Sequence, residues 1–155
     1  MSQLSATQPI ASYESRDVIT TSAAPSKAAK WTGRVMSAIP ALFLLMDAVM
    51  KFVKPEVVVK TTVELGFSES VIVPLGVVLL ASTLLYLFPR TAVLGAILLT
   101  GYLGGAVCTH VRVANPLFSH TLFPTYLGVL LWGGLLLREP RLRALLPVRT
   151  GAPRD

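Results

Sequence analysis

Three long runs without any charged residue dominate this sequence. They contain 20, 21 and 25 residues and are bounded in turn by Glu69, Arg90, Arg112 and Arg138. Each run is long enough for a helix to cross a hydrocarbon core, which takes about 20 predominantly apolar residues. Only 14% of the 155 residues are charged, whereas a soluble domain usually carries about 25%. The sequence therefore predicts a multipass membrane protein.

The apolar segments predict an all-α fold, a membrane-spanning four-helix bundle. Its four spans are expected at about 31–52, 71–88, 91–111 and 121–137, within one transmembrane domain over residues 31–137. The first span is the weakest, because Pro40 interrupts the backbone hydrogen bonding and Asp47 carries a charge. In the connector after it, Pro55 suits a first helical position and Gly66 suits a helix end. We therefore expect a short surface helix from Pro55 to Leu65.

The distribution of charge predicts the orientation of the chain. Four spans place both termini on one side, with residues 1–30 as a disordered tail and 138–155 as a basic tail. That side and its turn at Arg90 carry ten Lys and Arg residues, against four on the other side. By the positive-inside rule both termini should be cytoplasmic. The net charge of +6 then reflects membrane orientation and contact with lipid headgroups.

The composition also excludes several classes of protein. A nucleic-acid-binding domain would need a patterned basic face, which the sequence lacks. Cys108 is the only cysteine, so no intramolecular disulfide can form. No Cys/His array suggests a metal site. We expect no metal centre and no nucleic-acid partner.

A few polar residues inside the apolar segments are the candidates for function. Asp47 and Lys51 are one helical turn apart, so they can pair and reduce the cost of a carboxylate near lipid. Both could instead lie at headgroup depth, with Lys51 extended toward the interface. His110, Arg112 and His120 cluster around the end of the third span and the start of the fourth. They could bind a ligand or only make interfacial hydrogen bonds. No residue is predicted to be catalytic.

Five glycines are candidates for helix packing. Gly101 and Gly105 form a G-xxx-G pair in the third span, with Gly104 beside them, and Gly133 and Gly134 lie in the fourth span. Pairs of this kind allow the backbones of membrane helices to approach closely. The sequence therefore predicts packing seams at these positions.

Several stretches resemble the DoxX-like family of small bacterial membrane proteins. They are IPALFLLMDAVMKFVKP, PRTAVLGAILLTGYLGGAV-x-THVR and the ending W-G-G-L-x-L-R, within residues 35–147. The resemblance implies a four-helix bundle in the bacterial inner (cytoplasmic) membrane. The family takes its name from a membrane subunit of a thiosulfate-to-quinone oxidoreductase. None of that subunit's motifs matches here, so no catalytic residue is carried over.

The resemblance and the polar residues together suggest a function. We expect a small accessory subunit of a redox, quinone-linked membrane assembly, without enzyme activity of its own. Its partners would be the lipid bilayer and another membrane or redox protein. No cofactor motif is evident, but a quinone is the expected ligand, near Asp47, His110 and Arg112. The alternatives are a small-molecule permease and a purely structural membrane scaffold.

Overall fold

The structure, a computed structural model, describes residues 26–139 and 142. Within them are five α-helices, four of them long and apolar, which confirms the expected all-α bundle. The elements are α1 (Lys27–Val53), α2 (Glu56–Glu64), the short 3-10 helix η1 (Glu69–Val71), α3 (Ile72–Leu87), α4 (Ala92–Arg112), the short π-helix η2 (Leu117–Thr121) and α5 (Phe123–Arg138). Most of the two predicted tails, 1–30 and 138–155, lies outside the described residues.

Helix α1 begins four residues before the first predicted span. The reason is Ser26, whose hydroxyl accepts a hydrogen bond from the Ala29 amide at 3.1 Å and so caps the helix. The helix continues through Pro40 and ends at Val53. Lys54 then turns the chain with a positive φ of 50°. At 1.5 Å per residue the 27 residues of α1 span about 40 Å, more than the hydrocarbon core requires.

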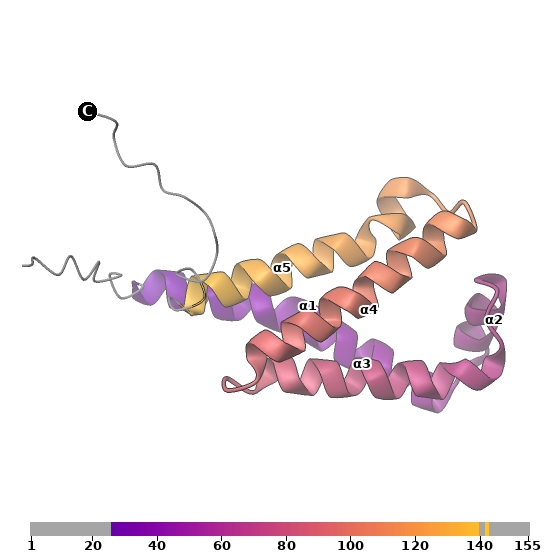
Figure 1. The fold of residues 1–155 in the computed structure, drawn as a ribbon, viewed down its shortest axis with the longest axis horizontal. Helices are drawn as coiled ribbons and strands as arrows, with labels where there is room; N and C mark the ends of the chain where they lie inside the picture. The colour runs from indigo at the N-terminus through magenta and orange to yellow at the C-terminus, as the bar shows by residue number, and fades with distance from the viewer. Residues whose placement is uncertain (1–25, 140–141, 143–155) are drawn as a thin grey trace, which may run out of the picture.

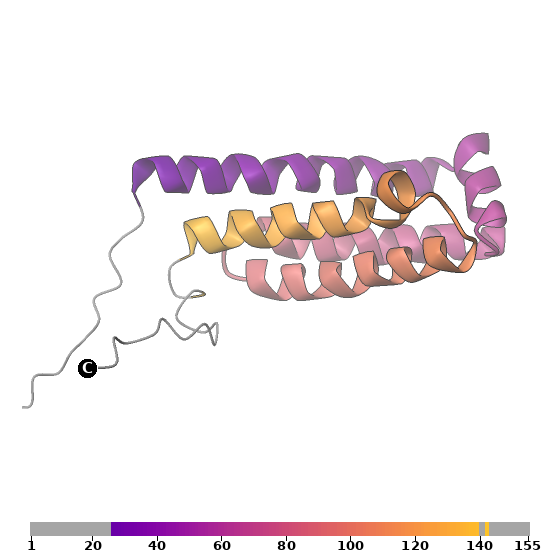
Figure 2. The same ribbon diagram turned by 90° about the horizontal axis from the view of Figure 1, so that it is seen from above.

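The four long helices pack side by side in a ring (Figure 1). Helix α1 contacts α3 and α5, and α4 contacts the same two helices, so α1 and α4 lie opposite each other. Figure 2 shows α1 along one face of the bundle and α4 along the other. Helix α2 lies across one end, which we call the α2 end. Helix α1 begins and α5 ends at the opposite end, which we call the terminal end.

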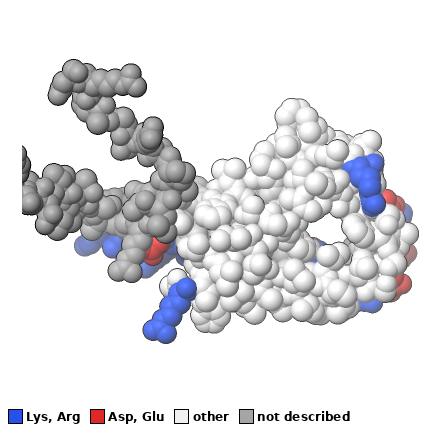
Figure 3. Space-filling model, in the orientation of Figure 1, with Lys and Arg blue, Asp and Glu red and all other residues white. Residues whose placement is uncertain are grey.

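The outer surface of the bundle is apolar. The four candidate spans, Lys27–Val53, Glu69–Leu87, Ala92–Arg112 and Leu117–Arg138, are long and apolar enough to cross a membrane. In the most apolar 18-residue window of each span, only 28–33% of the residues are buried inside the bundle. On the face in Figure 3, charged side chains lie toward the two ends and the surface between them is uncharged. So large an exposed apolar surface is unsuited to water, and the chain is a multi-pass membrane protein in contact with lipid.

The core is tightly packed toward the terminal end. Leu44, Leu79, Leu99 and Leu131 belong to one cluster and are at most 2% exposed. Tyr86 is fully buried there, and its hydroxyl lies 2.8 Å from both the Leu131 carbonyl oxygen and the Ser37 hydroxyl. Since the carbonyl can only accept, the phenol donates to it. One side chain of α3 thereby links α1 and α5.

Candidate functional site

A cavity of about 540 Å³ lies inside the bundle near the α2 end. Its volume falls within the range of about 300–1,000 Å³ that is typical of small-molecule sites. Helices α3 and α4 diverge toward this end (Figure 1), and α2 covers it. In Figure 3 the surface is hollowed beside α2, and basic side-chain atoms are visible inside the hollow. Most of the lining is apolar, with Phe43, Leu44, Val58, Leu65, Leu75, Leu103, Phe123 and Leu127 among it.

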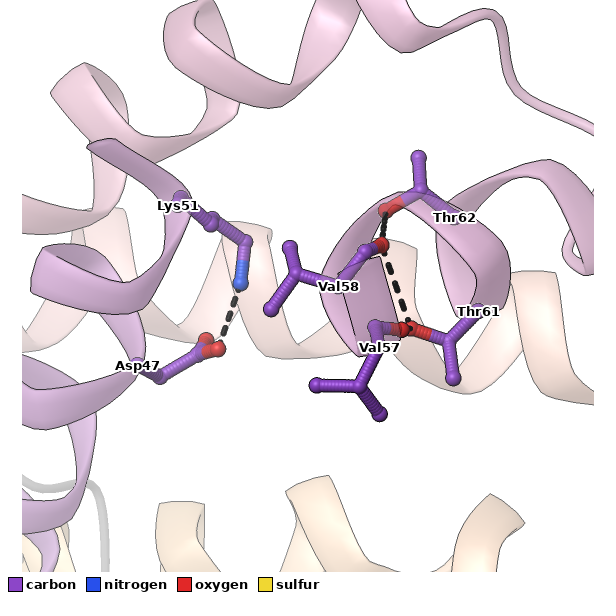
Figure 4. A network of polar contacts seen from close by, with 6 residues as sticks. All are labelled: Asp47, Lys51, Val57, Val58, Thr61 and Thr62. Carbon is purple, nitrogen blue, oxygen red and sulfur yellow. Dashed lines mark hydrogen bonds and ion pairs between the residues drawn. The ribbon is translucent and has the colours of Figure 1, made fainter. Parts of the chain in front are cut away.

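An ion pair on α1 is the main polar feature of the cavity. The Lys51 ammonium donates to Asp47 Oδ1 at 2.6 Å, and the two side chains are 16% and 34% exposed. Figure 4 shows the pair facing Val58 of α2. Residues four apart lie on one face of a helix, which is why the sequence spacing predicted this pairing. The pair reduces the cost of a carboxylate among apolar residues, about 2.5–3.5 kcal/mol when unpaired at mid-bilayer.

The hydroxyls that α2 contributes are already used within that helix. Thr61 donates to the Val57 carbonyl at 2.8 Å and Thr62 to the Val58 carbonyl at 2.7 Å (Figure 4). Both threonines line the cavity, so they offer it methyl groups and oxygen lone pairs. The Tyr102 phenol also lines the cavity, and its hydroxyl makes no hydrogen bond to any residue among 26–139. Lys51, Asp47 and Tyr102 therefore have groups available to hydrogen-bond a ligand.

The structure keeps two of the three predicted residues at the end of α4 together, because the rings of His110 and His120 meet edge to face. His110 lines the cavity, and its Nδ1 lies 2.8 Å from the Asn115 amide nitrogen. His120 does not line it; its ring centroid is 6.1 Å from that of His110, and its Nδ1 bonds the Ser119 hydroxyl at 2.8 Å. Within the described part of the chain, no three His, Cys, Asp or Glu side chains gather as metal ligands.

Arg112 lies outside the cavity and holds α2 in place. Its guanidinium donates to the Leu65 carbonyl at 2.5 Å and sits 5.6 Å from the centroid of the Phe67 ring. Leu65 and Phe67 both line the cavity. Of the five residues predicted to bind a ligand, the structure thus brings Asp47, Lys51 and His110 to one cavity and gives Arg112 a supporting contact.

The predicted packing glycines fall into two groups. In α5, a Cβ on Gly133 would lie 2.9 Å from Met36, and one on Gly134 would lie 2.8 Å from the Gly33 carbonyl oxygen, so both abut α1. On α4, a Cβ on Gly101, Gly104 or Gly105 would meet no described atom within 4 Å. Among the described residues, none of these three glycines packs closely against a neighbouring helix. Gly101 and Gly105 line the cavity instead, while Gly104 lines a shallower groove between α4 and α5.

Comparison with known proteins connects this architecture to a family. The family model described as the DoxX-like family matches residues 35–134. The chain belongs to the DoxX-like family. That match covers most of α1, all of α2 to α4 and most of α5, so it includes every residue that lines the cavity. No curated protein and no solved structure matched this DoxX-like chain.

Sequence reasoning missed two parts of the site in this DoxX-like protein. Tyr102 is not among the five candidate ligand-binding residues of the sequence analysis, although a hydroxyl in an apolar span needs a polar partner. The cavity wall formed by α2 was missed entirely. Two adjacent hydroxyl side chains in the surface helix, Thr61 and Thr62, were the sequence feature that could have indicated this wall, since both line the cavity.

Proposed function

We propose that this chain is a ligand-binding integral membrane protein that serves as an accessory subunit of a redox membrane assembly. The observation that carries the proposal is the cavity, in which the Asp47–Lys51 ion pair and the Tyr102 phenol face a mostly apolar space. Polar groups in a membrane bundle are costly and tend to mark functional sites. A mostly apolar pocket with a few convergent polar groups is also the usual form of a small-molecule site.

The chemistry of the lining fits a quinone-type headgroup. The Lys51 ammonium and the Tyr102 phenol can donate to carbonyl oxygens, and Asp47 can accept from the hydroxyl of a reduced ring. Apolar side chains such as Phe43 and Leu127 suit the faces of the ring. A bound quinone would supply electron transfer to or from a partner protein. The chain itself would bind the headgroup, orient it and keep water away from it.

The closed part of the core favours binding over transport through the bundle. Beyond the cavity, Leu79, Leu99 and Leu131 fill the space toward the terminal end and are at most 1% exposed. The buried hydroxyls there, Ser82 and Thr83, donate to carbonyls of their own helix at 2.7 and 2.8 Å. A permease would need unoccupied polar groups along this path. Liposome flux assays distinguish the two functions, since a binding subunit predicts no flux.

We also propose that the protein resides in the bacterial inner membrane with both termini in the cytoplasm. The support is the excess of Lys and Arg on the side of the termini, ten against four. Helix α1 begins and α5 ends at one end of the bundle (Figure 1), as an even number of spans requires. With this orientation the cavity lies in the periplasmic half of the membrane.

Equilibrium binding to the purified full chain tests the proposal. The probe is a benzoquinone with a ten-carbon tail, and the variants are Lys51→Met and Lys54→Met. Lys54→Met is the control, because Lys54 lies three residues after Lys51 and does not line the cavity. Its ammonium instead lies 3.8 Å from a carboxylate oxygen of Glu69. Charged hydrogen bonds contribute about 1.5–3 kcal/mol, so Lys51→Met should weaken binding by about tenfold or more. Lys54→Met should bind like the wild type.

Two results would count against this function. If the wild-type chain binds no quinone, the redox-ligand role is wrong, and a structural scaffold becomes the better account. If Lys51→Met and Lys54→Met lose affinity equally, the quinone binds elsewhere or only through general charge. Co-purification from membranes addresses the assembly itself, since an accessory subunit should retain a redox protein partner in mild detergent.

A further inference from the structure

One edge of the cavity is not covered by any residue that the structure describes. Gly101 and Gly105 line the cavity, both are exposed, and a Cβ on either would meet no described atom within 4 Å. Residues four apart on a helix lie on one face, separated by about 6 Å along the axis. The two glycines therefore leave a strip of bare backbone on α4. Figure 3 shows the hollow on the side of the bundle, where Figure 1, in the same orientation, places the gap between α3 and α4.

The end of the cavity that faces water is covered. Helix α2 lies across it and contributes Val58, Thr61 and Leu65 to the lining. Arg112, at the last turn of α4, fixes this cover through the Leu65 carbonyl at 2.5 Å and the Phe67 ring at 5.6 Å. A molecule approaching from the aqueous side would have to displace these contacts. One approaching between α3 and α4 would not.

The polarity of the lining changes along the bundle axis. Asp47, Lys51, Thr109 and His110 line the cavity in the turns of α1 and α4 nearest the α2 end, and Thr61 and Thr62 lie on α2 itself. In the deeper turns the lining is mostly apolar, with Phe43, Leu44, Leu103 and Leu127, and the Tyr102 phenol is the polar group there. A ligand that fills the cavity therefore needs a polar head at the α2 end and an apolar remainder.

We infer that the ligand is a lipid-soluble amphiphile with one flexible apolar chain, and that it enters sideways from the bilayer between α3 and α4. Its head reaches the Asp47–Lys51 pair, and its chain lies over the bare backbone at Gly101 and Gly105. This inference rests on the proposed binding site and adds the route and the need for a tail. The glycines are required because side chains there would fill the opening that the tail occupies.

The test compares two variants of α4 at glycines where an added Cβ meets equally open space. The double variant Gly101→Leu/Gly105→Leu places side chains in the opening, and Gly104→Leu places one in the neighbouring groove between α4 and α5. None of the three meets a described atom within 4 Å of its Cβ, so all should fold. Each is titrated, as the full chain in lipid nanodiscs, with benzoquinones that carry either a ten-carbon tail or none.

The tailed compound should bind the double variant at least about tenfold more weakly, or about 1.4 kcal/mol, and should bind Gly104→Leu like the wild type. The tail-less compound should bind all three chains equally. Unchanged affinity of the tailed compound for the double variant would overturn the sideways route while leaving the binding site intact. An equal loss in Gly104→Leu would also overturn it. If the wild type binds neither compound, the proposed function fails, and this inference fails with it.

Discussion

The close approach of α3 and α4 beside their turn makes a quantitative prediction about Gly95. A Cβ at this position would overlap the backbone of Tyr86 and lie 2.7 Å from the Leu85 carbonyl carbon, whereas ordinary contacts begin at 3.4 Å. The turn cannot widen freely, because Thr91 donates to the Leu85 carbonyl at 2.8 Å. In Gly95→Ala the two helices must therefore separate next to the buried Tyr86 ring.

The size of the effect follows from two opposing contributions. Alanine is favoured over glycine in a helix by about 0.8–1.0 kcal/mol, and overpacking typically costs about 1–3 kcal/mol. Gly104→Ala gains the first contribution without the second, since a Cβ there meets no described atom within 4 Å. Because the overlap at Gly95 is with backbone atoms, the cost of overpacking lies at its upper end. We therefore expect Gly95→Ala to lose about 2 kcal/mol of unfolding free energy, and Gly104→Ala to equal or exceed the wild type.

Reversible unfolding in mixed detergent micelles, followed by circular dichroism, measures both variants against the wild type. The comparison is well matched because the two substitutions are chemically identical and lie on the same helix. Equal stability of Gly95→Ala and Gly104→Ala would refute the helix packing described here. It would mean that α3 and α4 do not approach closely at their turn.

Three further predictions address other parts of the fold. Tyr86→Phe should lower the unfolding free energy by about 1 kcal/mol, the scale of a hydrogen bond between membrane helices, measured in the same micelle assay. Arg112→Met should speed hydrogen exchange of the α2 amides by about fivefold, or ~1 kcal/mol of lost contact, while exchange in α3 is unchanged. Reporter fusions at each terminus should both give a cytoplasmic signal, as the positive-inside rule requires.

Each of these has a result that contradicts it. A fully stable Tyr86→Phe variant would show that the contacts to Ser37 and Leu131 contribute nothing to the junction of three helices. Unchanged exchange in Arg112→Met would mean that α2 stays in place without the guanidinium. A periplasmic signal from both fusions would invert the proposed orientation and put the cavity on the cytoplasmic side.

The helices could be predicted from sequence because their signal is local. Runs of uncharged residues fix where a span can lie, and the Asp47–Lys51 spacing fixes which side chains share a face. Even the surface helix followed from Pro55 and Gly66. The early start of α1 was missed, since a capping serine such as Ser26 is hard to distinguish within a tail rich in serine.

The cavity could not be predicted, because it depends on how helices diverge over long sequence separations. The Gly101–Gly105 spacing favours helix packing, but packing requires a second helix close to these glycines. At this level of the bundle α3 diverges from α4 (Figure 1). Arg112 could be located near a membrane surface but not matched with its acceptor, the Leu65 carbonyl, 47 residues earlier in the chain. Likewise, Thr61 and Thr62 mark one side of the surface helix, but their sequence does not show that this side closes a cavity formed with α1 and α4.

The most direct test of the binding site is photoaffinity labelling of the full chain in membranes. The probe is a benzoquinone with a ten-carbon tail and a photoreactive group on its ring, and the labelled residues are located by mass spectrometry. If the headgroup occupies the cavity, the label should fall on its lining, above all near Lys51 and Tyr102, and an excess of unlabelled quinone should abolish it. Labelling confined to Val129 and Trp132, on the groove between α4 and α5, would contradict the site proposed here.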